Sequence, residues 1–404
     1  MEVVALWTGR HAAALRVAYR LSMEAFASKL GVAVRTVANW DANPETVPTP
    51  AYQAVLDTAL EQAPDTVRAR LFLLLDGHSL PPEPSTAAAG DRRAQDIGAI
   101  SAFRLADLRV GGGHLYPAIV QYLQQTVAPG LVGGGQAPAI PGTFTAAAAL
   151  TEMAGWMAHD GGQDEIAAGH FDQSLALARA GDDRQVKAHV LGSISHLRGR
   201  ARQHDLAIAA ALAGQEALVG GPRVPGLEAR LYAMQARGEA GCGRAQECER
   251  LLGLAETTLE ARADCERSPW VGAFDEAALA TEASRCRRRA GDLAGAGAMA
   301  GRVLVLRSPA RARSHALAQL TVAVARAADG ECAGACEAGA AALEATHGLG
   351  SYVILEQLQE LAKMLQPYKT SREVRAFGQH LGDELRERMV LFRSLQAGTA
   401  GGAP

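Results

Sequence analysis

From residue 144 onward the chain repeats one pattern, in which stretches of about 15 to 18 residues with helical periodicity alternate with short turns rich in glycine and aspartate. Alternate turns mark repeat units. The residues that open the second helix of each pair are Gln163, His204, Arg244, Asp292 and Glu331, so that the successive intervals are 41, 40, 48 and 39 residues. Helix pairs of this kind bury their apolar faces only by stacking, and the stack leaves a concave surface that is the expected ligand or partner site.

The intervals are longer than the roughly 34 residues of a strict tetratricopeptide repeat, which predicts a divergent, tetratricopeptide-like array. Composition agrees with an all-α fold. The chain of 404 residues is 48% hydrophobic but only 5% aromatic, and abundant alanine lets helix backbones approach closely. A chain of this length exceeds one hydrophobic core, so we expect two or three domains.

A second feature lies near the beginning of the chain, in the run LSMEAFASKLGVAVRTVANWD at residues 21–41. Ser22 is a good N-cap for a helix at 23–30. Gly31 then supplies the left-handed turn that a tight corner between two helices needs. This half of the run predicts one short helix that ends in a sharp turn.

A second short helix is predicted at 34–40, with Val37 and Trp40 facing inward. Ala27 lies where the two helices would cross, and a larger side chain there would push them apart. The four positions together fit a helix-turn-helix, and they are Ala27, Gly31, Val37 and Trp40.

This run resembles the helix-turn-helix of the XRE family, the phage-repressor type, over roughly residues 10–63, including a following helix at 51–63. The resemblance implies that the helix at 34–40 is a recognition helix in the major groove of double-stranded DNA. Most of residues 95–265, most distinctively the stretch around Gly155 to Asp160, resembles XRE-type regulators of actinobacteria that carry tetratricopeptide repeats. That likeness implies a transcription regulator and no defined ligand.

Carried onto this chain, the resemblance assigns Arg35 to guanine, Asn39 to adenine or phosphate, and Thr36 to a thymine methyl or phosphate. Basic residues, Arg16 among them, would make positioning contacts. The full set of DNA-binding candidates is Arg10, Arg20, Ser22, Lys29, Val34, Arg35, Thr36 and Asn39.

Two positions depart from the family pattern. Met23 stands where the family usually has Gln, and Ala33 stands where Ser or Thr usually caps the recognition helix. Losing such a cap costs about 1 kcal/mol. The alternative function is therefore a repeat-based interaction scaffold in which the helix-turn-helix serves packing or dimerisation and does not bind DNA.

Prolines and glycines divide the chain. Pro81, Pro82 and Pro84 cannot continue a helix and lie among small polar residues typical of a linker. The glycine-rich run LVGGGQAPAIPG closes a short intermediate segment. The predicted organisation is a helix-turn-helix domain at 1–76, a linker at 77–95, a helical connector at 96–143, a tetratricopeptide-like repeat domain at 144–396 and a flexible tail at 397–404.

Several residues raise other chemistry. His159-Asp160 suggests a metal-dependent phosphohydrolase, but ordinary helix surfaces and turn ends explain the histidines better. Cys332 and Cys336 share a helix face without a further ligand, which favours packing over a metal site, and disulfides are not expected. Gly111 to His114 suggests an anion nest, although a tight helix–helix turn is the simpler account. We find no catalytic cluster, and expect neither enzyme activity nor a cofactor.

Five aromatic residues, Trp156, Phe171, Tyr232, Trp270 and Phe274, fit either core positions or a ligand groove, and core is the simpler role for most. Trp156 and Trp270, with His114 beside the glycine-rich loop, are the candidates for an effector pocket. The cluster Arg285, Arg287, Arg288 and Arg289 is expected to be a solvated helix end complemented by the helix dipole.

The sequence as a whole predicts an all-α, sequence-specific DNA-binding regulator that acts as a homodimer and takes a peptide or small-molecule effector in its repeat groove. The net charge of −3 requires any affinity for DNA to come from a local patch. No apolar stretch is long enough to span a membrane, and the N-terminus lacks the order of a signal peptide. We expect a cytoplasmic protein without membrane partners.

Overall fold

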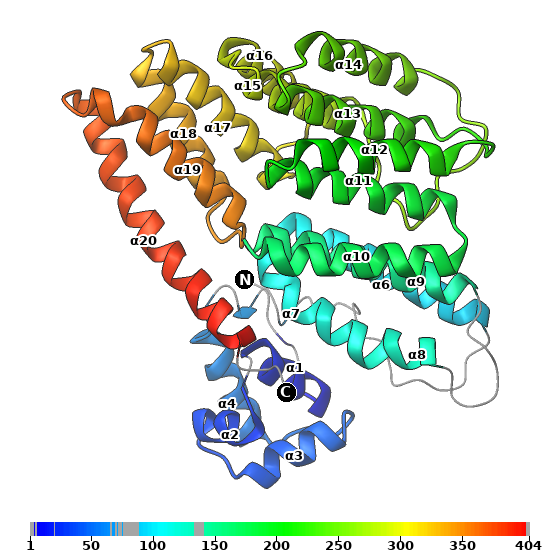
Figure 1. Cartoon of the computed structure of the whole chain (residues 1–404). Coiled ribbons are helices and arrows are strands. Elements are labelled where there is room, and N and C mark those ends of the chain that lie inside the picture. Colours follow the sequence, from blue (N-terminus) through cyan, green and yellow to red (C-terminus); the bar gives the residue numbers. More distant parts are fainter. Residues whose placement is uncertain are drawn as a thin grey trace. The chain divides into compact units, whose positions relative to one another are not determined.

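The computed structural model describes residues 4, 6–19, 21–64, 67–68, 71, 75, 89–132 and 141–400, and all regular elements within them are helices (Figure 1). The all-α prediction is confirmed. The chain divides into two compact units, residues 1–86 (unit 1) and 87–404 (unit 2). None of the described helices is long and apolar enough to cross a membrane.

Unit 1 contains the helix-turn-helix. Its described helices are α1 (Gly9–Tyr19), α2 (Met23–Leu30), α3 (Val34–Ala42) and α4 (Pro50–Glu61). The Ser22 hydroxyl accepts a hydrogen bond from the Ala25 N–H at 3.2 Å, so Ser22 caps α2 as predicted. Gly31 ends that helix in the left-handed conformation, with φ of 68°.

The core of unit 1 forms where α1, α2, α3 and α4 meet. Ala27 is 1% exposed, and Phe26, Val37 and Trp40 are buried around it, as the sequence predicts. Trp7 joins the same core, and its indole N–H donates to Asp57 at 2.7 Å. The small side chain at Ala27 therefore determines how closely α2 and α3 approach.

Unit 2 begins with α6 (Ala89–Val110), α7 (Gly112–Tyr122), the π-helical turn η1 (Leu123–Val127) and α8 (Ala128–Val132). The remaining helices are α9 (Pro141–Asp160), α10 (Asp164–Gly181), α11 (Arg184–Arg200), α12 (His204–Leu218), α13 (Pro225–Gly241), α14 (Ala245–Leu259), α15 (Glu276–Arg289), α16 (Leu293–Leu306), α17 (Ala312–Ala328), α18 (Cys332–Ala345), α19 (Tyr352–Leu365), η2 (Gln366–Tyr368) and α20 (Arg372–Ala400).

Two predicted boundaries need correction. Helix α6 begins at Ala89, so residues 89–95 are helical and do not belong to the linker predicted at 77–95. Helix α20 continues to Ala400, beyond the start of the tail predicted at 397–404. Residues 89–95 contain Ala and Arg, which are good helix formers that the composition-based boundary overlooked. Residues 397–400 extend the end of a long helix that begins at Arg372.

The repeats are helix hairpins, in which α9 packs on α10, α11 on α12, α13 on α14, α15 on α16 and α17 on α18 (Figure 1). The odd-numbered helices form a second set of contacts, because α9, α11, α13 and α15 pack side by side and α17 packs on α19. Stacking of this kind buries the apolar faces of the pairs, as predicted.

The turn within each hairpin has one residue with positive φ, and these residues are Gly162, Arg202, Gly243, Gly291 and Gly330. The next residue caps the second helix in every case. In the second hairpin that cap is Gln203, so the equivalent of Gln163 is Gln203 and not His204. The interval of 48 residues in the sequence pattern arises from the long connection at 260–275 between α14 and α15.

A half-buried ion cluster joins early and late helices of unit 2. The Arg313 guanidinium on α17 contacts Asp107 on α6 at 2.6 and 2.9 Å, and Asp160 on α9 at 2.7 Å. Asp160 also accepts from the Ser351 hydroxyl at 2.6 Å and from the Gly112 N–H at 2.9 Å. Burial lowers the pKa of Arg313, but Asp160 and Asp107 outweigh it and raise the pKa well above its ordinary value. The cluster ties helices early in unit 2 to helices late in it.

We predict that Ala27→Leu destabilises unit 1 by about 1–3 kcal/mol, because the added atoms force α2 and α3 apart. Calorimetric unfolding of the full chain measures this effect. Ala25→Leu on the exposed side of α2 is the matched control, and equal loss of stability in both variants would contradict the account.

We also predict that Arg313→Met destabilises unit 2 by about 2 kcal/mol or more, because it leaves two carboxylates without their cation. The effect stays below that of a fully buried pair because the Arg313 side chain is 28% exposed. Arg311→Met, at an exposed arginine two residues earlier, should change the unfolding temperature little. Similar shifts in both variants would argue against a closing role for Arg313.

Candidate functional site

The first candidate site is the outer face of α3. Arg35 and Asn39 are one helical turn apart and exposed, while Val37 and Trp40 point into the core on the opposite side. Val34 is 42% exposed at the N-terminus of the helix. The Asn39 side-chain oxygen accepts from the Asn43 amide at 2.9 Å, which leaves the Asn39 amide N–H groups directed outward for a further contact.

The remaining DNA-binding candidates of unit 1 have varied surroundings. Thr36 is half-buried near the start of α3. The Ser22 hydroxyl caps α2, and Lys29 lies 4.5 Å from the centre of the Tyr19 ring. The Arg10 backbone N–H donates to the Pro44 carbonyl beyond the C-terminus of α3. Arg20 lies outside the described residues.

Arg16 does not fit the positioning role that the sequence suggested. Its guanidinium forms a 2.6 Å ion pair with Asp41 on α3 and donates to the Leu21 carbonyl at 3.1 Å. These contacts join α1 to α3 and use donors that a phosphate would need. Ala33 makes no side-chain hydrogen bond to α3, as expected from the absence of a capping side chain.

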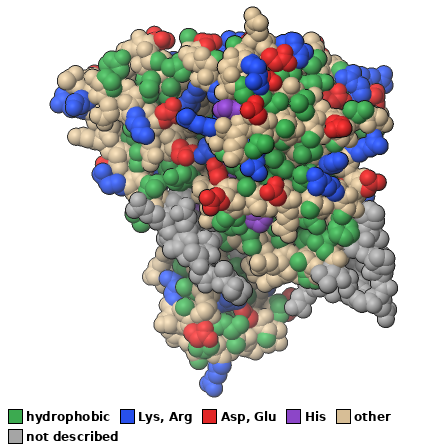
Figure 2. Space-filling model, viewed as in Figure 1, with side chains coloured by type: hydrophobic (Ala, Val, Ile, Leu, Met, Phe, Trp, Pro, Cys, Tyr) green, Lys and Arg blue, Asp and Glu red, His purple; other side chains and the backbone are tan. Residues whose placement is uncertain are grey.

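The second candidate site lies in unit 2, where α9, α11, α13 and α15 carry polar side chains at buried positions. The buried residues are Glu152, His189, Ser193, His196, Arg237 and Glu282, and Arg230 lies beside them half-buried. Glu152 is 5% exposed. Figure 2 shows basic, acidic and histidine side chains close together around a recess in unit 2. A buried polar lining of this kind is costly unless its members are hydrogen-bonded.

Two arginine–histidine pairs repeat along this lining. Arg230 donates to Nδ1 of His189, and Arg237 donates to Nδ1 of His196 at 2.8 Å. Each pair joins α11 to α13 across 41 residues of sequence, and the two pairs are two helical turns apart. The repeat interval of the array therefore also sets the spacing of its inner polar groups.

The histidines of these pairs are held neutral. Burial, then Arg230, Arg104 and Arg267, lower the pKa of His189 well below its ordinary value of 6.5. This occurs although Nε2 of His189 lies 3.4 Å from a Glu152 oxygen. Burial, followed by Arg237 and Arg285, lowers the pKa of His196 in the same way. With Nδ1 accepting from arginine, the Nε2–H of His189 is directed toward Glu152.

Trp156 lies on the polar lining. Its indole N–H donates to Glu152 at 2.6 Å and to the Ser193 hydroxyl at 3.1 Å, and its ring packs edge-on against His196 with 4.7 Å between the ring centres. Trp156 is therefore half-buried, with its indole N–H held between the Glu152 carboxylate and the Ser193 hydroxyl.

The other two effector-pocket candidates have different neighbours. The Trp270 side chain is buried in a core that includes Val271, and it lines a separate hollow of about 420 Å³ with Thr145, Asp183 and Gln185. His114 packs against the backbone of Gly350. In place of a phosphate, the Gly112 N–H meets the carboxylate of Asp160, which gives the glycine-rich turn a structural partner.

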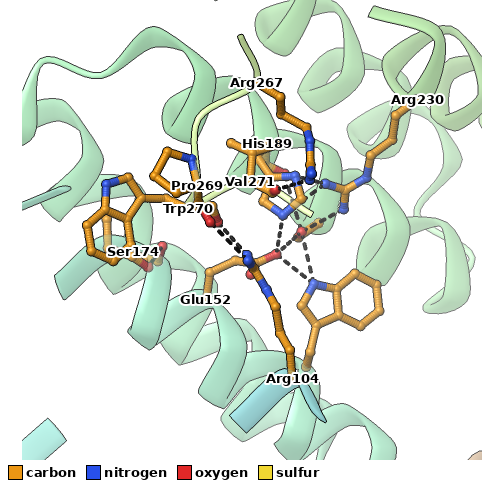
Figure 3. Close-up of polar contacts among 12 residues, drawn as sticks. Arg104, Glu152, Ser174, His189, Arg230, Arg267, Pro269, Trp270 and Val271 are labelled. Carbon is orange, nitrogen blue, oxygen red and sulfur yellow. Dashed lines mark hydrogen bonds and ion pairs between the residues drawn. The ribbon is translucent and has the colours of Figure 1, made fainter. Parts of the chain in front are cut away.

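The connection at 260–275 reaches across the lining. Its Pro269 and Trp270 carbonyls accept hydrogen bonds from Arg104 of α6 at 3.0 and 2.6 Å, and its Arg267 donates to the Val271 carbonyl at 2.5 Å (Figure 3). Arg104, Glu152, Ser193, Arg230 and Arg267 did not emerge from the sequence as site residues. In the sequence, His189 and Arg230 are 41 residues apart, and so are His196 and Arg237. This repeated spacing is the signal that could have identified Arg230 as a member of the cluster.

The residues that the sequence raised as possible metal ligands, and the cysteines, have structural neighbours. No group of three His, Cys, Asp or Glu side chains in the part of the chain that the structure describes is arranged to hold a metal ion. Cys336 is buried in an apolar core, as the packing prediction expected, and all six cysteines are free. His159 contacts Asp164 at 2.6 Å, and Asp160 belongs to the Arg313 cluster.

A second groove, of about 750 Å³, lies beside α14, α15 and α16. Its apolar lining includes Leu252, Phe274 and Leu279. The acidic residues around it are Glu249, Glu256, Glu260, Asp275 and Glu276. Arg287 and Arg302 also line the groove and pair with Glu249, Glu256 and Glu276.

The depressed histidine pKa values predict that stability falls as the pH drops. In the unfolded chain both histidines take up protons near pH 6.5, whereas the folded chain resists protonation until lower pH. Their contribution is complete above pH 6.5 and is lost as the pH falls through that value toward the folded-state pKa, by about 1.4 kcal/mol for each unit of difference.

We therefore expect the unfolding free energy to fall between pH 7.5 and 5.5, and His189→Gln with His196→Gln to flatten this dependence. Glutamine keeps an acceptor for each arginine but does not titrate. His347→Gln, at an exposed histidine, is the control. An unchanged slope in the double variant would show that other groups cause the dependence.

No family model and no curated protein matches the chain. Among solved structures, it is similar to one described as "Crystal Structure of Rap Protein Complexed with Competence and Sporulation Factor", with a TM-score of 0.49 and 10% sequence identity over 83% of this chain and 97% of that chain. This likeness is too low to indicate a function, so both candidate sites are defined by the residues of this chain alone.

Proposed function

We propose that the protein is a sequence-specific DNA-binding transcription regulator whose repeat domain binds an effector and mediates dimerisation. The observation that carries the proposal is the exposed pair Arg35 and Asn39 on α3, supported from behind by Val37 and Trp40. In the major groove, an arginine guanidinium such as that of Arg35 pairs with guanine, and an asparagine amide such as that of Asn39 pairs with adenine.

Several features of unit 1 support this reading. Val34, exposed at the start of α3, offers an apolar contact to a thymine methyl. Lys29, Arg10 and the backbone near Ser22 offer charge and hydrogen bonds for phosphates. A short recognition helix contacts few base pairs, so two copies on adjacent half-sites give a useful affinity, which favours a homodimer.

The repeat domain supplies the effector part of the proposal. Its inner lining brings charged and aromatic groups of α9, α11 and α13 into one place, which suits a peptide or a small molecule. A ligand that binds one arrangement of the helices better than another would shift the population of DNA-competent dimers.

The alternative function is an interaction scaffold that does not bind DNA. The groove beside α14 and α16 favours it, as does Val305 on α16, which is 85% exposed. The two functions separate at α3, because only the DNA-binding regulator requires Arg35 and Asn39 for its activity.

The test is binding of the full chain to fragments of its own upstream region at two salt concentrations. We expect selective, salt-sensitive binding that Arg35→Ala with Asn39→Ala weakens at least about tenfold, since each base contact is worth about 1–3 kcal/mol. Arg179→Ala, at an exposed arginine of α10, removes the same charge and should bind as the parent. Binding that is unselective, or unchanged in the double variant, would favour the scaffold.

A further inference from the structure

Three arginines from distant parts of unit 2 converge beside His189. Arg104 belongs to α6, Arg230 to α13 and Arg267 to the connection at 260–275. Figure 3 shows their guanidinium groups directed toward the same small region, together with Glu152. Like charges that lie close together repel, so three neighbouring guanidinium groups need negative charge or hydrogen-bond acceptors to offset the repulsion.

The described residues give this cluster little negative charge. Arg104 donates to two carbonyls, Arg267 to one carbonyl, and Arg230 to the Ser193 hydroxyl at 2.9 Å and to the neutral ring of His189. Glu152 is the carboxylate drawn in Figure 3, and its hydrogen bonds come from Trp156 and Ser193. Glu282 also attracts Arg230, but it is already paired with Arg237 and Arg285. The positive charges of this region therefore outnumber its carboxylates.

Burial makes this excess costly. Desolvation lowers the pKa of Arg104, with Glu152 opposing and Arg267 adding to the effect. Desolvation also lowers the pKa of Arg230, against the attraction of Glu152 and Glu282. An arginine side chain with depressed basicity gains when an anion arrives, because the anion restores the attraction that water no longer supplies.

The cluster is also accessible and has donors to spare. Arg267 is exposed, and Arg104 and Arg230 are half-buried. A guanidinium group has five N–H donors, of which one on Arg267 and two on Arg104 are used in the contacts above. Planar forks of this kind match the oxygens of carboxylate and phosphate groups.

The connection at 260–275 assembles this arrangement. It lengthens one repeat interval to 48 residues, and it supplies both Arg267 and the carbonyls that hold Arg104 in place. Gln185 of α11 fixes the same connection, accepting from the Ser268 N–H at 2.7 Å. The connection at 260–275 thus adds the positive charge of Arg267 to the cluster and orients the guanidinium of Arg104.

We propose that Arg104, Arg230 and Arg267 bind an oxyanion group, a phosphate or a carboxylate, of the ligand that occupies the groove of unit 2. Trp156, held by Glu152, lies beside the site and gives a fluorescence signal for its occupancy. The identification of this ligand as the effector rests on the proposed function, whereas the anion site itself does not.

The probes are inorganic phosphate and tetra-aspartate, titrated into the full chain without DNA, with sodium chloride at matched ionic strength as the reference. Tryptophan fluorescence and calorimetry should show saturable binding of at least one probe. Arg267→Gln should weaken that binding at least tenfold, and being exposed it should leave folding intact. Arg262→Gln, at an exposed arginine of the same connection, should bind as the parent.

Phosphate binding alone would identify a phosphate-bearing ligand, and tetra-aspartate binding alone an acidic peptide, and either supports the site. Absence of saturable binding for both probes, or equal affinity in Arg267→Gln and the parent, overturns it. The variant Arg35→Ala with Asn39→Ala should bind the anion normally. If the parent chain shows no selective DNA binding but binds the anion, the regulator is contradicted and the anion site stands.

Discussion

The contact of Arg313 with Asp107 and Asp160 joins the early and late helices of unit 2. An open stack of helix pairs would leave its two ends free to separate, and the inner polar faces would be hydrated. Because one guanidinium on α17 joins carboxylates of α6 and α9, the stack curls until early and late helices meet. Arg200 of α11 continues the seam by pairing with Glu356 of α19. The charges of the inner faces lie on α9, α11 and α13, which pack side by side, so they interact directly.

Within that closed space the electrostatics are unbalanced. The arginine–histidine pairs of α11 and α13 satisfy hydrogen bonds but add no negative charge, because burial and neighbouring guanidinium groups keep both histidines neutral. A protein that needed only stability would gain from apolar residues at such positions. The anion that we propose would offset the charges of Arg104, Arg230 and Arg267 around Glu152 and turn an unfavourable charge distribution into binding energy.

The two units use different strategies for recognition. In unit 1 a compact apolar core around Ala27 supports one exposed face of α3, so specificity would come from a few side chains on a rigid helix. In unit 2 the groups that could contact a ligand come from α6, α9, α11, α13 and the connection at 260–275, so specificity would come from the packing of many helices. Under the proposed function, a ligand that alters this packing would act on the dimer, and the anion site would serve the regulator in this way.

The sequence by itself determined the local structure. The cap at Ser22, the left-handed Gly31, the inward Trp40 and the glycines of the hairpin turns each depend on interactions within a few residues, and all were readable as patterns. The repeat interval was readable too, with an error of one residue at Gln203. The tertiary structure alone decided the arginine cluster, because Arg104, Arg230 and Arg267 follow no common motif. They meet only when α6, α11 and α13 pack and the 260–275 connection contacts α6. It likewise assigned Arg16 to Asp41, and Trp156 and Trp270 to different surroundings, since which charges and rings become neighbours is set by packing across many residues and not by local propensity.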